Sequence, residues 1–266
     1  MSEQNYRIAV VDRALDVLEA LAEARGPVGV SDIARTIGAT KSAVFRILVN
    51  LERRGYVLRD PTSSKYQLGG RLVQLGYHAL ATFDVRERAR PVLEALHERF
   101  NETVNLAIPV NGRLLYIDMI ESEHGLRMAA RIGATDEMHS TALGKAILSF
   151  LPEEQREQVL RSPLAKRTAQ TNTDPASLRQ ELERIRASGV AEDHGENEPG
   201  ACCYGSPIFD HAGNVTAAVS ISAPERRLRG EVAEEVRQAV LAAAQDITDR
   251  IGGRWPPMSS QGSENG

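Results

Sequence analysis

The feature that most constrains the fold is a three-residue interval, Gly38-Ala39-Thr40, between two short segments with helical patterns of apolar residues. Before it, a helix of barely two turns is expected to have Ser31 as its N-cap and to stop at Gly38, a residue suited to the left-handed conformation after a helix. After it, Thr40 can cap a longer helix with an apolar face formed by Val44, Ile47, Leu48 and Leu51. A connection this short forces the two helices to cross.

A preceding helix is indicated by another apolar stripe, which ends before Gly26-Pro27. The stripe consists of Val11, Leu15, Leu18 and Ala22. After the longer helix, two alternating segments, 56–59 and 65–68, flank a loop rich in turn residues and predict a hairpin. This part of the chain therefore predicts three small helices and a hairpin.

The face of the longer helix opposite its apolar stripe is small and basic. It carries Lys41, Ser42, Arg46, Val49 and Arg53. Such a face fits the major groove of DNA, where Arg and Lys read guanine edges and Ser reaches bases or phosphates. Two further basic residues, Arg59 and Lys65, flank the hairpin tip, from which they can reach the phosphate backbone or the minor groove.

The distribution of charge supports a DNA contact. The whole chain has a formal net charge of −4, yet residues 35–71 contain eight Lys or Arg residues and only two acidic residues. A short basic segment on an acidic protein indicates local contact with a polyanion. The alternative is a solvated protein-binding domain with ordinary surface charges. The clustered charge and the short turn favour double-stranded DNA as the partner.

The length of 266 residues predicts two domains, and 42% apolar and 26% charged residues are typical of globular chains. No apolar run approaches the ~20 residues that span a bilayer, and the N-terminus lacks the apolar core of a signal peptide. We therefore expect a cytoplasmic protein with no membrane partner. The only cysteines, Cys202 and Cys203, are adjacent, which argues against a disulfide framework and a zinc site.

The second half predicts mixed strands and helices. Asn111-Gly112 joins two β-rich runs as a type I′ hairpin, and before it we expect a helix through Leu80 and a second helix with Pro91 in its first turn. The remaining expected strands are 126–131, 204–209 and 215–222, and the remaining expected helices are 141–151, 153–160, 175–187 and 231–251. This order favours an α+β fold over a parallel doubly wound sheet, and a disordered tail is expected at 252–266.

No catalytic or cofactor motif in this half is complete. The run 139–146 lacks the first glycine and the final Ser or Thr of a phosphate-binding loop, so no nucleotide is expected. His124, His139, His194 and Cys203 lack the spacing of metal ligands, so neither a metal nor another cofactor is expected. Because no set of nucleophile, base and orienting group is recognisable, the sequence argues against an enzyme.

The same run is better explained as the start of a helix. Ser140 or Thr141 can cap it, which leaves N–H groups near Ala142 and Leu143 directed at an anion. Two serines on a predicted strand are two residues apart and therefore share a face: Ser220 and Ser222. The alternative is that the hydroxyls and the cap only satisfy neighbouring backbone groups.

Short runs in both halves occur together in a specific combination. In the first half they are 12–18 (DRALDVL), 31–34 (SDIA), 41–48 (KSAVFRIL), 55–57 (GYV) and 66–69 (YQLG). In the second half they are 139–146 (HSTALGKA), 200–203 (GACC), 207–210 (PIFD) and 218–224 (AVSISAP). Together they resemble the IclR family of bacterial transcriptional regulators over residues 7–251.

The resemblance implies a winged helix-turn-helix DNA-binding domain at 5–69 and a connector helix at 70–84. At 85–251 it implies an effector-binding domain, a GAF-like antiparallel sheet flanked by helices. Phe45 lies in a matching run and joins the expected DNA-binding residues. The resemblance also implies a small organic acid bound in a pocket formed by Ala142, Leu143, Asp193, Ala201, Cys203, Ser220 and Ser222.

Two short segments depart from the family pattern. Asp136-Glu137 stands where an apolar residue and proline are common, and Gly205-Ser206 replaces a common Ala-Ala. Either change can alter the size and polarity of the pocket, so the identity of the effector does not transfer.

The sequence therefore predicts a ligand-responsive, DNA-binding transcriptional regulator, and specifically a repressor of a catabolic operon. Because one recognition helix reads only a half-site, a palindromic operator implies a homodimer, and the resemblance adds a tetramer formed from two dimers. One rival is an enzyme acting on a small carboxylate with an accessory DNA-binding module. The other is an architectural DNA binder that needs no ligand.

Overall fold

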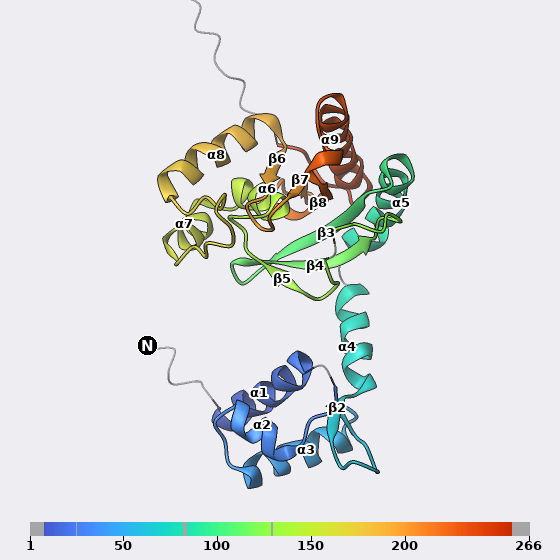
Figure 1. The fold of residues 1–266 in the computed structure, drawn as a ribbon, viewed down its shortest axis with the longest axis vertical. Helices are drawn as coiled ribbons and strands as arrows, with labels where there is room; N and C mark the ends of the chain where they lie inside the picture. Colours follow the sequence, from blue (N-terminus) through green and yellow to red (C-terminus); the bar gives the residue numbers. More distant parts are fainter. Residues whose placement is uncertain (1–7, 25, 82–83, 129, 257–266) are drawn as a thin grey trace, which may run out of the picture. The chain divides into compact units, whose positions relative to one another are not determined.

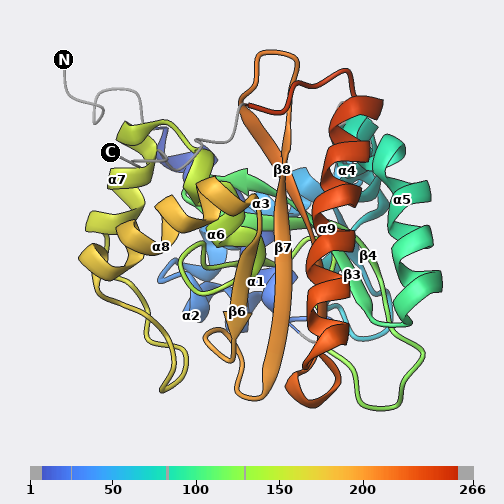
Figure 2. The same cartoon turned by 90° about the horizontal axis from the view of Figure 1, so that it is seen from above.

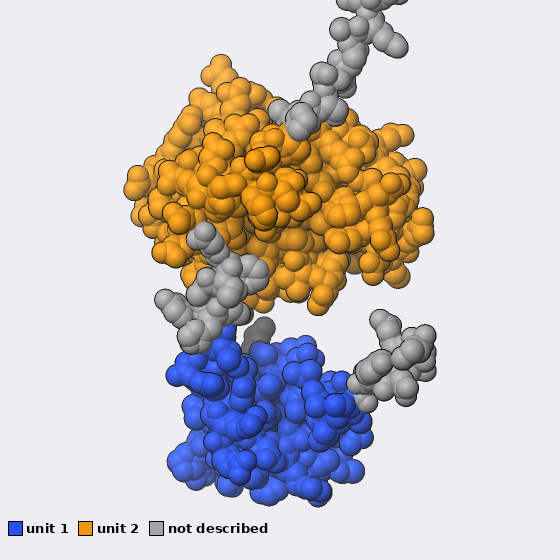
Figure 3. All heavy atoms as spheres, turned by 180° about the vertical axis from the view of Figure 1, so that it is seen from behind, with its two compact units in different colours: residues 1–82 blue, residues 83–266 orange. Residues whose placement is uncertain are grey.

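The computed structural model describes residues 8–24, 26–81, 84–128 and 130–256. The chain divides into two compact units, residues 1–82 and residues 83–266 (Figure 3). Each unit has a hydrophobic core of its own. Within the described ranges, no helix combines the length and the apolar character needed to cross a bilayer.

The first unit contains three helices, a two-stranded hairpin and a fourth helix (Figure 1). These elements are α1 (Ala9–Glu23), α2 (Val30–Thr36), α3 (Lys41–Arg53), β1 (Val57–Arg59), β2 (Tyr66–Leu68) and α4 (Gly70–Ala81). Strands β1 and β2 pair antiparallel. The core of this unit is formed by Val17, Leu21, Ile33, Ala34, Val44, Ile47, Leu48, Val57 and Tyr66. The predicted three helices and hairpin are confirmed.

The short connection between α2 and α3 has the predicted geometry. Gly38 has a φ of 63°, which a residue with a Cβ adopts at a cost. The Thr40 hydroxyl oxygen accepts the N–H of Ala43 at 3.3 Å and caps α3. The predicted cap of α2 is wrong, because Gly29 occupies the N-cap position and Ser31 lies inside the first turn.

The buried face of α1 also differs from the prediction. The buried and half-buried residues that pack in the core are Ala14, Val17, Leu18 and Leu21. Val11 and Leu15 are 49% and 51% exposed, and Ala22 is exposed. Because α1 carries apolar residues on more than one side, their spacing alone could not identify the side that packs against α2 and α3.

The second unit is built on a six-stranded antiparallel sheet with the order β5-β4-β3-β8-β7-β6. Its strands are β3 (Thr103–Val110), β4 (Arg113–Ile120), β5 (Thr135–Asp136), β6 (Ala191–His194), β7 (Ala201–Phe209) and β8 (Val215–Pro224). The β3–β4 hairpin turns at Asn111 and Gly112, whose φ angles of 49° and 76° fit the predicted type I′ turn. The predicted α+β class is confirmed.

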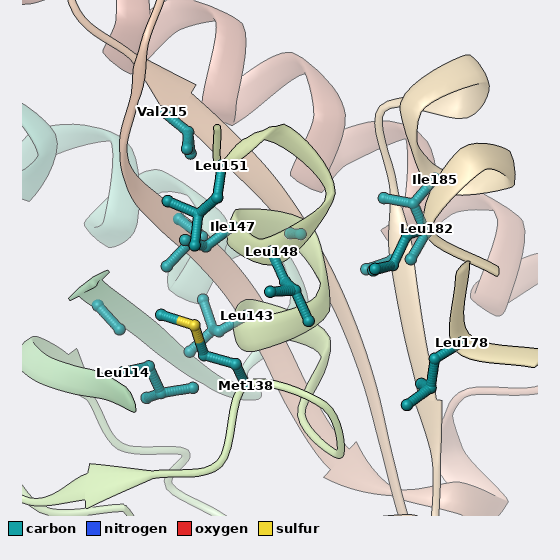
Figure 4. Close-up of a cluster of buried hydrophobic side chains, with 14 of the residues drawn as sticks. Leu114, Met138, Leu143, Ile147, Leu148, Leu151, Leu178, Leu182, Ile185 and Val215 are labelled. Carbon is teal, nitrogen blue, oxygen red and sulfur yellow. The ribbon is translucent and has the colours of Figure 1, made fainter. Parts of the chain in front are cut away.

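Helices cover both faces of this sheet (Figure 2). The helices of the second unit are α5 (Asp84–Phe100), α6 (Ala142–Phe150), α7 (Glu153–Arg161), α8 (Pro175–Ser188), the short 3-10 helix η2 (Glu225–Arg227) and α9 (Glu231–Arg250). Helices α5 and α9 lie together on one face, whereas α6 covers the other face and α8 packs against α6. Figure 4 shows the core on the α6 side, which includes Leu114, Met138, Leu143, Ile147, Leu148, Leu178, Leu182 and Ile185.

Two predicted features of the second unit are wrong, and two strands were not predicted. The described residues of the segment 126–131 form no strand, and two of their carbonyl groups accept side-chain hydrogen bonds instead: Thr103 donates to the Met128 carbonyl and Arg227 to the Leu126 carbonyl. Pro91 lies inside α5 rather than in its first turn. Strands β5 and β6 were not expected, although they form the two edges of the sheet.

The first residues of the expected disordered tail are folded. The N–H of Gly253 donates to the Thr248 carbonyl at 2.7 Å, and the Arg254 N–H donates to the Asp210 carbonyl at 3.0 Å. The indole of Trp255 meets the ring of Phe209 edge to face, with centroids 4.9 Å apart. Residues 252–256 are therefore part of the folded unit, and the rest of the expected tail lies outside the described residues.

Candidate nucleic-acid interface and ligand pocket

The outward face of α3 presents the side chains predicted to enter the major groove. These are Lys41, Ser42, Phe45, Arg46 and Arg53, and all five are exposed. The opposite side of α3 is buried in the core of the first unit. Phe45 keeps 47% of its surface exposed, so the face combines basic, small and apolar groups. This combination is complementary to the major-groove edges of base pairs, which present hydrogen-bonding groups and thymine methyl groups.

The β1–β2 tip is fixed by a carboxylate between the two predicted basic residues. Asp60 accepts the N–H of Thr62 at 2.7 Å and that of Ser63 at 3.3 Å, and the bond from Thr62 is the main cause that lowers the pKa of Asp60. Arg59 and Lys65 stand on the two sides of this turn, and both are exposed. The tip therefore holds two cations at the surface on a short, hydrogen-bonded loop.

The second unit contains a cavity of about 280 Å³ between the sheet and the start of α6. All seven residues predicted for the effector pocket line it: Ala142, Leu143, Asp193, Ala201, Cys203, Ser220 and Ser222. The strand register explains this convergence. Ser222 lies opposite Thr103 on β3 and opposite Cys203 on β7, and Cys203 lies opposite Asp193 on β6. One polar row thus crosses four strands and forms the floor of the cavity.

The start of α6 supplies backbone donors at the edge of this floor. Of the two candidate caps, Thr141 is the one used, because its Oγ1 accepts the N–H of Gly144 at 3.0 Å. The N–H groups of Ala142 and Leu143 lie in the first turn, where the helix itself offers no acceptor. The helix dipole places positive potential at the same point. This end of α6 is therefore suited to an anion.

A glycine on β7 lets the start of α6 approach the sheet. A Cβ at Gly205 would lie 2.8 Å from the carbonyl carbon of Ala142 and 3.0 Å from the backbone nitrogen of Leu143. Gly205 also lies directly opposite Ser220 in the β7–β8 pairing. At Gly205, where Ala is common, the missing Cβ therefore leaves room for the first turn of α6 beside the strand next to the two serines.

Several residues that line the pocket were missed by sequence analysis, and two of them add polar groups next to the predicted set. Asn105 is buried on β3, and its side-chain nitrogen donates to the hydroxyl oxygens of Ser220 at 3.3 Å and Ser222 at 3.1 Å. Each serine keeps its own hydroxyl hydrogen for donation, and Ser222 also lies within hydrogen-bond reach of the Cys203 thiol. Tyr116 on β4 also lines the cavity. In the sequence, the only signal for Asn105 was a polar side chain among apolar residues of a predicted strand. For Tyr116 it was a phenol in the next predicted strand.

Burial controls the protonation of the acidic groups in the pocket. Asp193 is 2% exposed, and burial raises its pKa to about 6 although its carboxylate accepts the N–H of Glu196 at 2.7 Å. Burial also raises the pKa of the Cys203 thiol and that of the Tyr116 hydroxyl. Near neutral pH the Cys203 thiol and the Tyr116 phenol are therefore neutral. The Asp193 carboxyl ionises at a higher pH than an exposed aspartate does.

A buried lysine ties α6 to the loop that closes the cavity. The Nζ of Lys145 lies 2.6 Å from a carboxylate oxygen of Glu181 and 2.5 Å from one of Glu196, and its side chain is fully buried. Glu196 precedes two residues of that loop, Asn197 and Glu198, which line the cavity. The ion-pair triad therefore joins helix α6 to one wall of the pocket.

Two family models match the chain. The model of the IclR helix-turn-helix domain matches residues 10–61, and the model of the bacterial transcriptional regulator IclR C-terminal domain matches residues 77–249. The second match alone covers more than half of the chain.

Curated relatives and solved structures agree with these matches. The HTH-type transcriptional regulator KdgR of Escherichia coli is 32% identical over 95% of this chain and 96% of its own, and the transcriptional repressor IclR of the same organism is 30% identical over 93% and 91%. The Thermotoga maritima IclR structure superposes with a TM-score of 0.76 at 35% identity, covering 92% of this chain and all of its own. A structure of an IclR homologue from Microbacterium hydrocarbonoxydans gives 0.82 at 26% identity, covering 91% and 98%. The chain therefore belongs to the IclR family and is a ligand-responsive, DNA-binding transcriptional regulator rather than an enzyme.

Proposed function

We propose that the chain is a repressor that binds a palindromic operator and is controlled by a small organic acid. The observation that carries the acid is the convergence of two helix-end N–H groups and two serine hydroxyls in one cavity. Donors of both kinds stabilise a carboxylate, and the low polarity of a buried site strengthens each bond. Repression is supported by the relatives that are named repressors, the Escherichia coli IclR and the acetate operon repressor of Salmonella typhimurium.

The acid is proposed to bind with its carboxylate between α6 and β8. Ala142 and Leu143 contribute N–H groups, and Ser220 and Ser222 contribute hydroxyls that Asn105 orients from β3. Asp193, Ala201 and Cys203 then surround the rest of the ligand. The Microbacterium homologue was crystallised with 4-hydroxybenzoate, which is an organic acid. That complex supports an acid as the class of ligand.

The operator contact is proposed to involve α3 and the β1–β2 tip. Lys41, Ser42, Phe45, Arg46 and Arg53 would enter the major groove, while Arg59 and Lys65 contact phosphates or the minor groove. Because the chromosome is the target, we place the protein in the cytoplasm.

A homodimer is proposed because one α3 helix reads only half of a palindrome. Apolar side chains on α1 and α4 support this assembly, since Val10, Leu15 and Val73 are 62%, 51% and 74% exposed. Exposed apolar groups mark a protein contact where they form a contiguous patch. Light scattering of the full chain measures the mass and distinguishes the dimer from a tetramer of two dimers.

Replacing Ser222 by alanine is expected to weaken acid binding by about 1.5 to 3 kcal/mol, because one hydrogen bond to a charged group is lost. Operator affinity without acid should stay nearly unchanged. Titration of wild type and Ser222→Ala with an acid found in a thermal-shift screen of small carboxylates, on and off DNA, measures both quantities. Equal acid affinity would place the ligand elsewhere, and weaker operator binding without acid would assign the serine a structural role.

Replacing Arg46 by alanine is expected to cost about 1 to 3 kcal/mol of operator affinity and to relax the choice of base at one position in each half-site. Arg184→Ala is the matched control, because Arg184 is an exposed arginine on α8 in the other unit. Fluorescence anisotropy with operator variants measures both effects. A uniform loss across all sequences would indicate a phosphate contact, and full affinity in a folded variant would remove Arg46 from the interface.

A further inference from the structure

Carboxylates dominate the charge of the pocket lining. Asp136, Asp193 and Glu198 all line the cavity, and of the described residues that do so Arg131 alone is a cation. Asn197 connects two of these acids, because its side chain donates to Asp136 at 2.8 Å and its backbone N–H reaches Asp193. A ligand held by one carboxylate at α6 therefore meets negative charge at Asp136 and Asp193, and a second carboxylate placed beside these two acids rather than beside Arg131 would be repelled.

Tyr116 supplies a neutral donor beside these acids. Its side chain lines the cavity within electrostatic range of Asp136 and Asp193. Within the described part of the chain, no hydrogen bond involves the Tyr116 hydroxyl. A ligand that shields this hydroxyl from solvent and offers it a hydrogen-bonding group gives the phenol a partner. A ligand without such a group leaves the hydroxyl unpaired, which costs free energy.

We propose that the effector is a monocarboxylate that also carries a hydroxyl group, selected by Tyr116 and Asp193. This inference rests on the proposed function, because it assumes that the carboxylate binds at α6. A hydroxyl can donate to the Asp193 carboxylate and accept from the Tyr116 hydroxyl at the same time. An ammonium group only donates, a ketone only accepts, and an alkyl group does neither. The hydroxyl alone among these groups satisfies both side chains.

The size of the site limits the ligand. A cavity of about 280 Å³ corresponds to roughly nine water volumes. It lies at the small end of the range of ligand pockets, ~300 to 1,000 Å³. Hydroxy acids of a few carbon atoms fit this volume together with their hydrogen bonds.

Calorimetric titration of the full chain with a matched set of acids tests the inference. The set is butyrate, 2-, 3- and 4-hydroxybutyrate, 2-aminobutyrate and succinate, at one pH and ionic strength. At least one hydroxybutyrate should bind about tenfold or more tightly than butyrate, and succinate should bind more weakly than butyrate. In Tyr116→Phe the preference for that hydroxybutyrate over butyrate should fall about tenfold, because the ligand hydroxyl loses its donor and butyrate no longer leaves a phenol unpaired.

The outcomes separate the inference from the proposed function. Equal binding of butyrate and the hydroxybutyrates, or tighter binding of 2-aminobutyrate or succinate, overturns the hydroxyl selection and leaves the acid site intact. An undiminished preference in Tyr116→Phe also overturns it. If none of the acids binds, the carboxylate site itself fails, and the proposed function fails with it. Loss of butyrate binding in Tyr116→Phe would show that the phenol supports the fold of the pocket rather than ligand selection.

Discussion

Replacing Lys145 by methionine is expected to lower the free energy of unfolding of the second unit by about 3 to 5 kcal/mol. Burial alone would lower the pKa of Lys145, but Glu181 and Glu196 outweigh burial and raise it, so the lysine is charged in the folded protein. Methionine fills a similar volume but leaves both carboxylates without their cation. Glu196 also has one buried oxygen without a partner, so it gains little compensation elsewhere.

Urea denaturation followed by tryptophan fluorescence measures this change in the full chain. Trp255 is the only tryptophan and packs on Phe209, so its fluorescence reports the second unit. Lys166→Met is the matched control, because Lys166 is exposed. Adding Glu181→Gln and Glu196→Gln to Lys145→Met should recover part of the loss, since the unpaired charges disappear. A loss below about 1 kcal/mol in the single variant would contradict a stabilising role for the triad.

Local sequence signals predicted the elements whose geometry depends on a few adjacent residues. The β3–β4 hairpin follows directly from Asn111-Gly112, because both residues must adopt a positive φ in a type I′ turn. The cap at Thr40 and the glycine at 38 are signals of the same kind. The positive φ angles at Gly38, Asn111 and Gly112 are conformations that few residue types adopt, and the Thr40 cap needs one of the few side chains that can accept a first-turn N–H.

Features that depend on packing partners could not be predicted in this way. Two apolar stripes of α1 have helical spacing, and only contact with α2 and α3 buries Val17 and Leu21 rather than Val11 and Leu15. In the pocket, pattern alone indicated two serines on one face and a helix start. Which residues of β3, β6 and β7 lie beside those serines is set by strand register, a long-range property, and Asn105 was missed for that reason. The remaining predicted lining residues came from the family resemblance.

Asp193 should make the stability of the second unit depend on pH in the direction opposite to most carboxylates. Burial raises its pKa from 3.8 to about 6, so its ionisation is less favourable in the folded state than in the unfolded state. Its contribution to stability is fully present below pH 3.8 and is lost as the pH rises through about 6. Since each pKa unit corresponds to ~1.4 kcal/mol, the loss approaches about 2 to 3 kcal/mol near pH 7.5.

Asp193→Asn removes the ionisation while keeping an oxygen that can accept the Glu196 N–H. The variant should therefore be more stable than wild type by about 2 to 3 kcal/mol near pH 7.5, and this difference should shrink as the pH falls toward about 4. Urea denaturation with Trp255 fluorescence at several pH values gives both curves, and Asp249→Asn, an exposed change on α9, is the control. A difference that does not change with pH would mean that burial does not penalise the Asp193 carboxylate. A variant less stable than wild type near pH 7.5 would mean that the charge itself holds the loop of Glu196 and Asn197, whose backbone N–H groups it accepts.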